Sequence, residues 1–288
     1  MQAIAKPWQD AQRWNTAQRW NTAQRIDVHN HVWDIERGGG GPWSGKLDVR
    51  HAERLLDKGD QLGIDFFCVS APLTSETPSP DEVHLANDVV LQAMDRSDRF
   101  VGFCFVNPGY AREALQEIER CIVDGGMVGI KLYHQYLVSD PAQRPVMDRA
   151  AELGVPVLMH AGKVMDTITR ARQPRLSNAA HFVAAAKMFP ATTLIQAHIG
   201  GGGDWEWNLR LLETCPPNVY MDTSGSVIDR GIVDRTIATL GVNRVLFATD
   251  GSLEEGIGKV LEADLSPEDR ARVFAGNARD LLANNRRA

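Results

Sequence analysis

Two histidines separated by one residue follow a short apolar run near the start of the chain. Residues 26–31 read Ile-Asp-Val-His-Asn-His, and an apolar run of this length is typical of a buried strand. Side chains alternate between the faces of a strand, so His29 and His31 are expected to point the same way. Two such imidazoles are half of a zinc-type site, although the pair alone could also be two surface histidines in a turn.

Further ligand-type residues end later apolar runs. Lys131 lies near the end of one run, His160 and His198 end two more, and Asp222 and Asp250 end the last two. Single buried histidines are usually structural, so these residues point to a site only if the fold brings their strand ends together. Whether these residues form one site therefore depends on the secondary-structure elements that carry them.

Short apolar runs alternate with amphipathic stretches of helical length along residues 25–285. The runs are rich in Val, Ile, Phe and Leu, which predicts strands covered on both faces. The predicted strands are 26–31, 65–70, 100–106, 128–133, 155–161, 193–200, 219–223 and 245–250. The predicted helices are 52–62, 80–97, 111–124, 141–153, 178–189, 205–214, 229–240 and 267–284.

Eight strands and eight helices in alternation favour parallel pairing and a closed (β/α)8 TIM barrel. The alternative is an open doubly wound sheet, which usually carries a glycine-rich phosphate loop after its first strand. The glycines at 38–41 lack the G-x-G-x-x-G spacing, so we interpret them as a loop. In a barrel the chemistry lies at the carboxyl ends of the strands, and four histidines and an aspartate would then meet on one rim.

Several strand-end motifs resemble the amidohydrolase superfamily. The resemblance is to the amidohydrolase-related group that includes aminocarboxymuconate-semialdehyde decarboxylase-like enzymes, and it covers about residues 25–285. It is carried by Ile-Asp-Val-His-Asn-His, Val-Gly-Ile-Lys-Leu-Tyr, Pro-Val-Leu-Met-His-Ala-Gly, Gln-Ala-His-Ile-Gly-Gly, Leu-Phe-Ala-Thr-Asp-Gly and the Ala-Gly-Asn-Ala at 275–278.

The resemblance implies that His29, His31 and His160 bind a divalent metal, with Asp250 as a further ligand or a hydrogen-bonded neighbour. Imidazole and carboxylate ligands suit Zn2+, our first expectation, and would also accept Mn2+ or Fe2+. Asp250 would then take the proton of a metal-bound water, and His198 would stabilise the developing oxyanion.

Lys131 admits two roles. The lysine of this strand is carboxylated and bridges two metals in some branches of the superfamily, whereas a plain ammonium would pair with a substrate carboxylate. We expect one metal and count Lys131 with Asp250 and His198 as catalytic residues.

The site is compatible with two reactions on a small molecule. The main expectation is hydrolysis of an amide, lactone or related bond in a carboxylate-bearing or cyclic substrate by metal-activated water; the alternative is non-oxidative decarboxylation of an aromatic or unsaturated acid. The loops that follow the predicted strands carry aromatic and basic residues. These residues either suit a planar acid as substrate or only pack and carry solvated charge. They are Trp33, Trp43, Lys163, Arg170, Arg172, Arg175, Trp205 and Trp207.

Composition narrows the class of protein. The 288 residues carry a net charge of -6, which argues against a nucleic-acid surface. We find neither a membrane-length apolar run nor a signal peptide, and the four cysteines form no Cys-x-x-Cys pair, so we expect a cytoplasmic enzyme, in which a homodimer would be a common outcome. We expect one barrel domain over 25–288 and an extension over 1–24, in which a hexapeptide repeats at 11–16 and 17–22.

Overall fold

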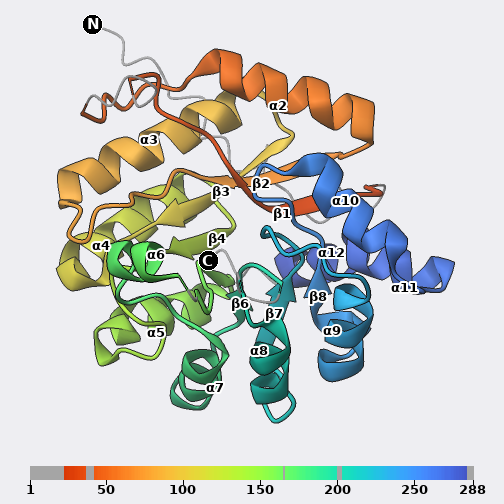
Figure 1. Ribbon diagram of the computed structural model, residues 1–288. Coiled ribbons are helices and arrows are strands. Elements are labelled where there is room, and N and C mark those ends of the chain that lie inside the picture. Colours follow the sequence, from red (N-terminus) through yellow and green to blue (C-terminus); the bar gives the residue numbers. More distant parts are fainter. Residues whose placement is uncertain (1–22, 37–41, 165, 200–202, 284–288) are drawn as a thin grey trace, which may run out of the picture.

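Eight parallel strands pair in chain order in the computed structural model, which describes residues 23–36, 42–164, 166–199 and 203–283 (Figure 1). The strands are β1 (Ile26–His31), β2 (Phe66–Ser70), β3 (Phe100–Phe105), β4 (Gly129–Leu132), β5 (Val157–Met159), β6 (Leu194–Gln196), β7 (Val219–Asp222) and β8 (Val245–Leu246). Backbone bonds from Val28 N–H to Phe247 O (3.0 Å) and from Asp250 N–H to His29 O (2.8 Å) join the chain after β8 to β1. The predicted (β/α)8 TIM barrel is confirmed.

Helices connect successive strands and surround the barrel. They are α2 (Val49–Leu62), α3 (Pro80–Arg96), α4 (Ala111–Ile118), α5 (Arg144–Leu153), α6 (Thr167–Arg172), α7 (Ala179–Met188), α8 (Trp205–Leu212), α9 (Ile232–Leu240), α10 (Leu253–Glu262), α11 (Pro267–Ala271) and α12 (Asn277–Ala283). Short 3-10 or π segments are η4 (Pro108–Tyr110), η5 (Glu119–Asp124), η6 (Pro141–Gln143), η7 (Val242–Arg244) and η8 (Arg272–Gly276).

Two helices, α6 and α10, were not predicted from the sequence. All six residues of α6 are at least partly exposed, so this helix has no apolar face that a periodic pattern could reveal. It lies in the connection after β5, at the rim where the strands end (Figure 1). The predicted helix over 267–284 is divided into α11, η8 and α12.

Local sequence signals explain several helix ends. The Ser79 side chain accepts from Glu82 N–H while the Glu82 carboxylate accepts from Ser79 N–H, which is the capping box that the sequence predicts at the start of α3. Gly63 ends α2 in the left-handed conformation, with φ 63°. The sequence also predicts Gly125 just past a helix end, where a left-handed residue is expected, but its φ is −90° and the positive φ falls on Gly126.

Two sets of buried apolar side chains hold the barrel together. The larger packs the helices against the sheet. The smaller includes Cys68, Phe103, Leu158, Ile195 and Leu246 from five strands and continues into α12. In the part of the chain described, no helix has both the length and the apolar character that crossing a membrane requires. The hexapeptide repeat lies outside the described residues, and the division into an extension and a barrel domain stays a prediction.

Candidate active site

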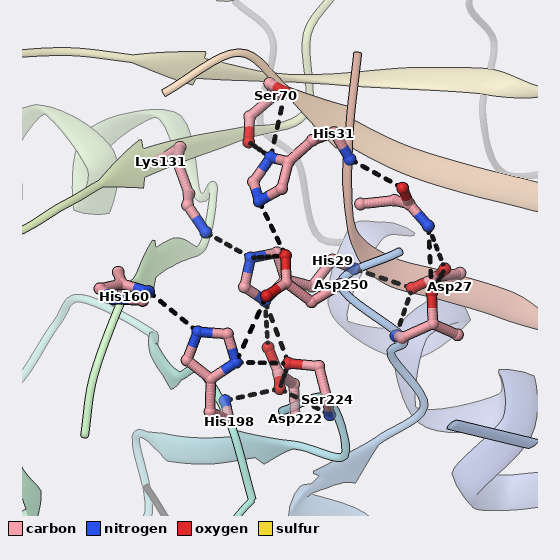
Figure 2. Close-up of polar contacts among 12 residues, drawn as sticks. Asp27, His29, His31, Ser70, Lys131, His160, His198, Asp222, Ser224 and Asp250 are labelled. Carbon is pink, nitrogen blue, oxygen red and sulfur yellow. Dashed lines mark hydrogen bonds and ion pairs between the residues drawn. The ribbon is translucent and has the colours of Figure 1, made fainter. Parts of the chain in front are cut away.

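Residues from six strand ends meet at one end of the barrel (Figure 2). His29 and His31 come from β1, Lys131 from β4, and His160 directly follows β5. His198, Asp222 and Asp250 come from the ends of β6, β7 and the segment after β8. The structure thus brings together every residue that the sequence predicted for the site.

Asp222 fixes the orientation of His29. Its Oδ2 lies 2.9 Å from His29 Nδ1, and both side chains are buried. Its Oδ1 accepts from the backbone N–H groups of His198 (2.8 Å) and Ser224 (3.0 Å). Burial alone would raise the pKa of Asp222, but His29 and the hydrogen bond from Ser224 lower it to about 2. Because this carboxylate is ionised, His29 donates its Nδ1–H to it and keeps the Nε2 lone pair.

Asp250 faces the two histidines of β1. Its Oδ1 lies 2.9 Å from His31 Nε2 and 3.7 Å from His29 Nε2. Burial raises the pKa of Asp250, but the neighbouring His29 and His31 hold it well below its usual range. His31 Nδ1 lies 3.2 Å from both the carbonyl oxygen and the hydroxyl of Ser70.

A chain of hydrogen bonds continues from Asp222 to His160. The Ser224 hydroxyl lies 2.6 Å from Asp222 Oδ1 and 3.0 Å from His198 Nδ1, and His198 Nε2 lies 2.9 Å from His160 Nδ1. Since ionised Asp222 can only accept, Ser224 donates to it and accepts from His198 Nδ1–H. His198 Nε2 then accepts from His160 Nδ1–H. This leaves a lone pair on His160 Nε2, 3.2 Å from Gln173 Oε1, so a hydrogen bond there requires the Gln173 amide to be flipped, with its NH2 group toward the imidazole.

All four histidines favour the neutral form. Burial is the main cause that lowers the pKa values of His29, His31 and His160, and it lowers that of His198 to about 4. Neutral imidazoles have a free lone pair, which a metal ion needs.

Backbone strain is concentrated at the same place. Among the described residues, His198 (φ 66°) and Asp250 (φ 49°) are the non-glycine residues with positive φ. Such conformations cost on the order of 1–3 kcal/mol each and are typical of functional sites. Gly225 makes room for His198, because a Cβ at Gly225 would lie 2.9 Å from the His198 Cβ.

The donor atoms of this site fit a divalent cation. Two groups within the described part of the chain bring three ligand atoms within 4.8 Å of one another: His29, His31 and Asp250, and His29, His198 and Asp222. Asp222 is already committed to four hydrogen bonds, so the first group is the better candidate. Lys131 Nζ, itself a cation, lies 2.5 Å from His29 Nε2. His160 belongs to neither group, so its role as a ligand stays a prediction.

Three residues that were not predicted from the sequence also support the ligands. They are Ser224, Gln173 and Gly225. Asp27 lies two residues before His29 on β1. Its carboxylate accepts hydrogen bonds from Asn30, Thr249 and the His29 backbone N–H.

A cavity of about 410 Å3 opens from the histidines, and we call it the histidine pocket. It is lined by His160, Gln173, His198, Ser226, Asp250 and Ser252, among others. The predicted rim residues do not enter it: Trp33 packs on His31 with ring centroids 5.4 Å apart, and Arg175 pairs with Glu76 at 3.3 Å.

Comparison with known sequences identifies the family of this chain and shows which reaction its relatives catalyse. The amidohydrolase family model matches residues 26–283. A γ-resorcylate decarboxylase of Polaromonas sp. strain JS666 is 23% identical over 298 residues, covering 83% of this chain and 89% of that protein. A γ-resorcylate decarboxylase of Rhodococcus jostii strain RHA1 is also 23% identical, with the same coverage.

Solved structures share the fold. A dihydroxybenzoic acid decarboxylase from Polaromonas sp. JS666, with bound manganese and the inhibitor 2-nitroresorcinol, gives a TM-score of 0.69 at 20% identity, covering 91% of this chain and 97% of that one. A 4-oxalomesaconate hydratase from Rhodopseudomonas palustris gives 0.69 at 19% identity, covering 90% and 96%. At these identities the likeness establishes the barrel and no particular reaction.

These comparisons correct one prediction. Hydrolysis was the main expectation, but the curated relatives are decarboxylases, which matches the alternative. Hydrolysis and decarboxylation use the same types of metal ligand, so the sequence motifs could not distinguish the two reactions. With the matched family model spanning nearly the whole barrel, the chain belongs to the amidohydrolase family and is an enzyme of the amidohydrolase superfamily.

Proposed function

We propose that this protein is a metal-dependent, non-oxidative decarboxylase of a hydroxylated aromatic carboxylic acid. The observation that carries the proposal is the match of most of the chain to γ-resorcylate decarboxylases, combined with a cation-binding donor set at the strand ends. The histidine pocket supports it, because a cavity of about 410 Å3 accommodates a one-ring acid.

His29, His31 and Asp250 would hold one divalent ion, with His160 as the further ligand that the family resemblance implies. When bound, the ion would supply positive charge that binds carboxylate and phenolate oxygens of the acid. Manganese is favoured over our first expectation of zinc, since a structural relative binds manganese. Lys131 adds a second positive charge beside His29, where it would attract the carboxylate to be lost.

The chain's own residues would manage the proton. Decarboxylation breaks the bond between the ring carbon and the carboxyl carbon, releases carbon dioxide and places a proton on the ring carbon. Asp250 and His198 both line the histidine pocket, and Asp250 Oδ2 lies 3.8 Å from His198 Nδ1. We assign to this pair the relay of a proton from solvent to the ring carbon, with Asp250, whose side chain is 30% exposed, as the member open to solvent. Because the pKa of Asp250 lies well below its usual range, the carboxylate passes this proton on and does not store it.

The test is product analysis with 2,6-dihydroxybenzoate. Protein stripped with chelator and reloaded with Mn2+ should release carbon dioxide and resorcinol in equal amounts, and Zn2+ reloading compares the two metals. Asp250→Asn should abolish both products. Asp229→Asn, which changes a carboxylate bonded to Trp205 Nε1, is the matched control and should retain them. Cleavage of lactones or amides, without carbon dioxide from any acid of a hydroxybenzoate panel, would overturn the proposal.

A further inference from the structure

A second cavity adjoins the histidine pocket, and we call it the basic pocket. It has a volume of about 810 Å3 and is lined by α6 and the residues on either side of it, including Lys163, Thr167, Arg170, Gln173 and Asn178. Four residues line both cavities: Gly162, Val164, Gln173 and Leu176. The two cavities therefore share a wall, and a ligand in one borders the other.

The charges in the two cavities differ. The histidine pocket is lined by two carboxylates, Asp166 and Asp250, and by no lysine or arginine of the described chain. The basic pocket is lined by Lys163 and Arg170 and by no described Asp or Glu. This separation favours an anionic group in the basic pocket.

Arg170 is the cation that is available to a ligand. Among the residues that the structure describes, none accepts a hydrogen bond from its guanidinium, whereas Lys163 Nζ lies over the Trp207 ring at 3.4 Å and 3.8 Å from Asp204. The planar guanidinium can bind a carboxylate with two parallel hydrogen bonds.

Gln173 lies between the two sites, because it lines both pockets. Its Oε1 lies 3.2 Å from His160 Nε2, and its backbone N–H bonds Thr169 O just past the end of α6, where its own backbone is no longer helical (φ −130°, ψ 64°). Arg170 precedes it by three residues and lines only the basic pocket. An anionic group at Arg170 would therefore be separated from the histidines by the Gln173 side chain.

We propose that the substrate is a diacid, whose reacting end occupies the histidine pocket while a second carboxylate binds Arg170 in the basic pocket. The inference rests on the proposed function for the identity of the reacting end. The new element is a second anionic group on the substrate, together with the residue, Arg170, that selects for this group. Because a wall that includes Gln173 separates the two pockets, the second carboxylate should be in the para position, which lies farthest from the reacting carboxylate on an aromatic ring.

Three ligands that differ at one ring position test the proposal. They are 2,6-dihydroxybenzoate, 2,6-dihydroxyterephthalate, which adds a carboxylate opposite the first, and the methyl ester of that added carboxylate, which adds the bulk without the charge. Binding to Mn2+-loaded protein is measured by calorimetry, and carbon dioxide release is recorded separately with the same samples.

The diacid should bind about tenfold or more tightly than either other ligand, as expected for a charge-assisted hydrogen bond. Arg170→Met should remove this preference. Arg172→Met is the matched control, because Arg172 is exposed on the same helix and lines neither pocket. The melting temperature of each variant verifies that it folds.

The outcomes separate the two proposals. Equal affinity for the diacid and the ester, or equal loss in both arginine variants, would overturn the second carboxylate site even if carbon dioxide is released. A diacid preference that depends on Arg170, without carbon dioxide from any ligand, would support the site and overturn decarboxylation.

Discussion

The Ser224 hydroxyl lies between Asp222 and His198, 2.6 Å from the Oδ1 of the first and 3.0 Å from the Nδ1 of the second. It donates to the carboxylate and accepts from the imidazole, so it sets the His198 tautomer with a lone pair on Nε2. That lone pair faces His160 Nδ1 at 2.9 Å, so one hydroxyl determines which nitrogen of His198 carries hydrogen.

Removing this hydroxyl should impair turnover more than folding. Ser224→Ala leaves His198 Nδ1–H without its acceptor in a buried site, and we expect kcat of the proposed decarboxylation to fall about ten- to hundredfold with a small change in KM. The kcat of Ser224→Cys, whose thiol is nearly isosteric and a weak acceptor, should lie between the values of the parent and of Ser224→Ala. A purely structural role would instead lower the melting temperature of Ser224→Ala and leave kcat of the folded fraction unchanged.

Asp222 should control metal affinity without touching the metal. Asp222→Asn removes the charge that orients His29 Nδ1–H, and we expect Mn2+ affinity to fall about 10–100-fold, measured by equilibrium dialysis and elemental analysis. Asp229→Asn serves as the control, since Asp229 bonds Trp205 on the outside of the site. Unchanged affinity in Asp222→Asn would remove Asp222 from its positioning role.

Alanine variants of Gly225 and Gly231 distinguish the effect of backbone strain from the effect of steric crowding. Both have positive φ, 94° and 76°, but a Cβ at Gly225 would meet His198 at 2.9 Å, whereas one at Gly231 would meet nothing within 4 Å. Each alanine variant should lose about 1–2 kcal/mol of unfolding free energy from the left-handed backbone. Gly225→Ala should additionally lose activity, because His198 must move. Equal activity in the two variants would contradict a tight packing of His198.

Acid stability should depend on a group remote from the site. Glu117 is buried and bonds Arg120, which holds its pKa below the ordinary value of 4.5 although burial raises it. A carboxyl whose pKa is lowered by folding stabilises the protein above its ordinary pKa, and this contribution is lost as the pH falls through the folded value.

Glu117→Gln should therefore be less stable than the parent at pH 7, and the difference should shrink below about pH 4.5. Urea unfolding at a series of pH values measures it. Glu113→Gln, which breaks the exposed ion pair with Arg112, is the control and should change stability little. A pH-independent difference between Glu117→Gln and the parent would show that packing, and not charge, explains the loss.

The sequence by itself determined the barrel and which side chains with metal-binding chemistry end its strands. The alternation of continuous apolar runs with amphipathic helices reflects strands buried on both faces, and this local pattern is visible without any contact. The same pattern places five residues at strand ends: His29, His31, His160, His198 and Asp250. Since parallel strands end on one rim, these residues were expected to meet there.

Only the tertiary structure determined how those residues are held. The bonds from Asp222 to His29 and from Ser224 to His198 join residues 193 and 26 positions apart, and no local pattern encodes such pairs. The bond between the Thr249 hydroxyl and the Asp27 carboxylate likewise joins residues 222 positions apart. The exposed helix α6, which has no apolar face, became visible only when the structure placed Arg170 in a pocket beside the histidines.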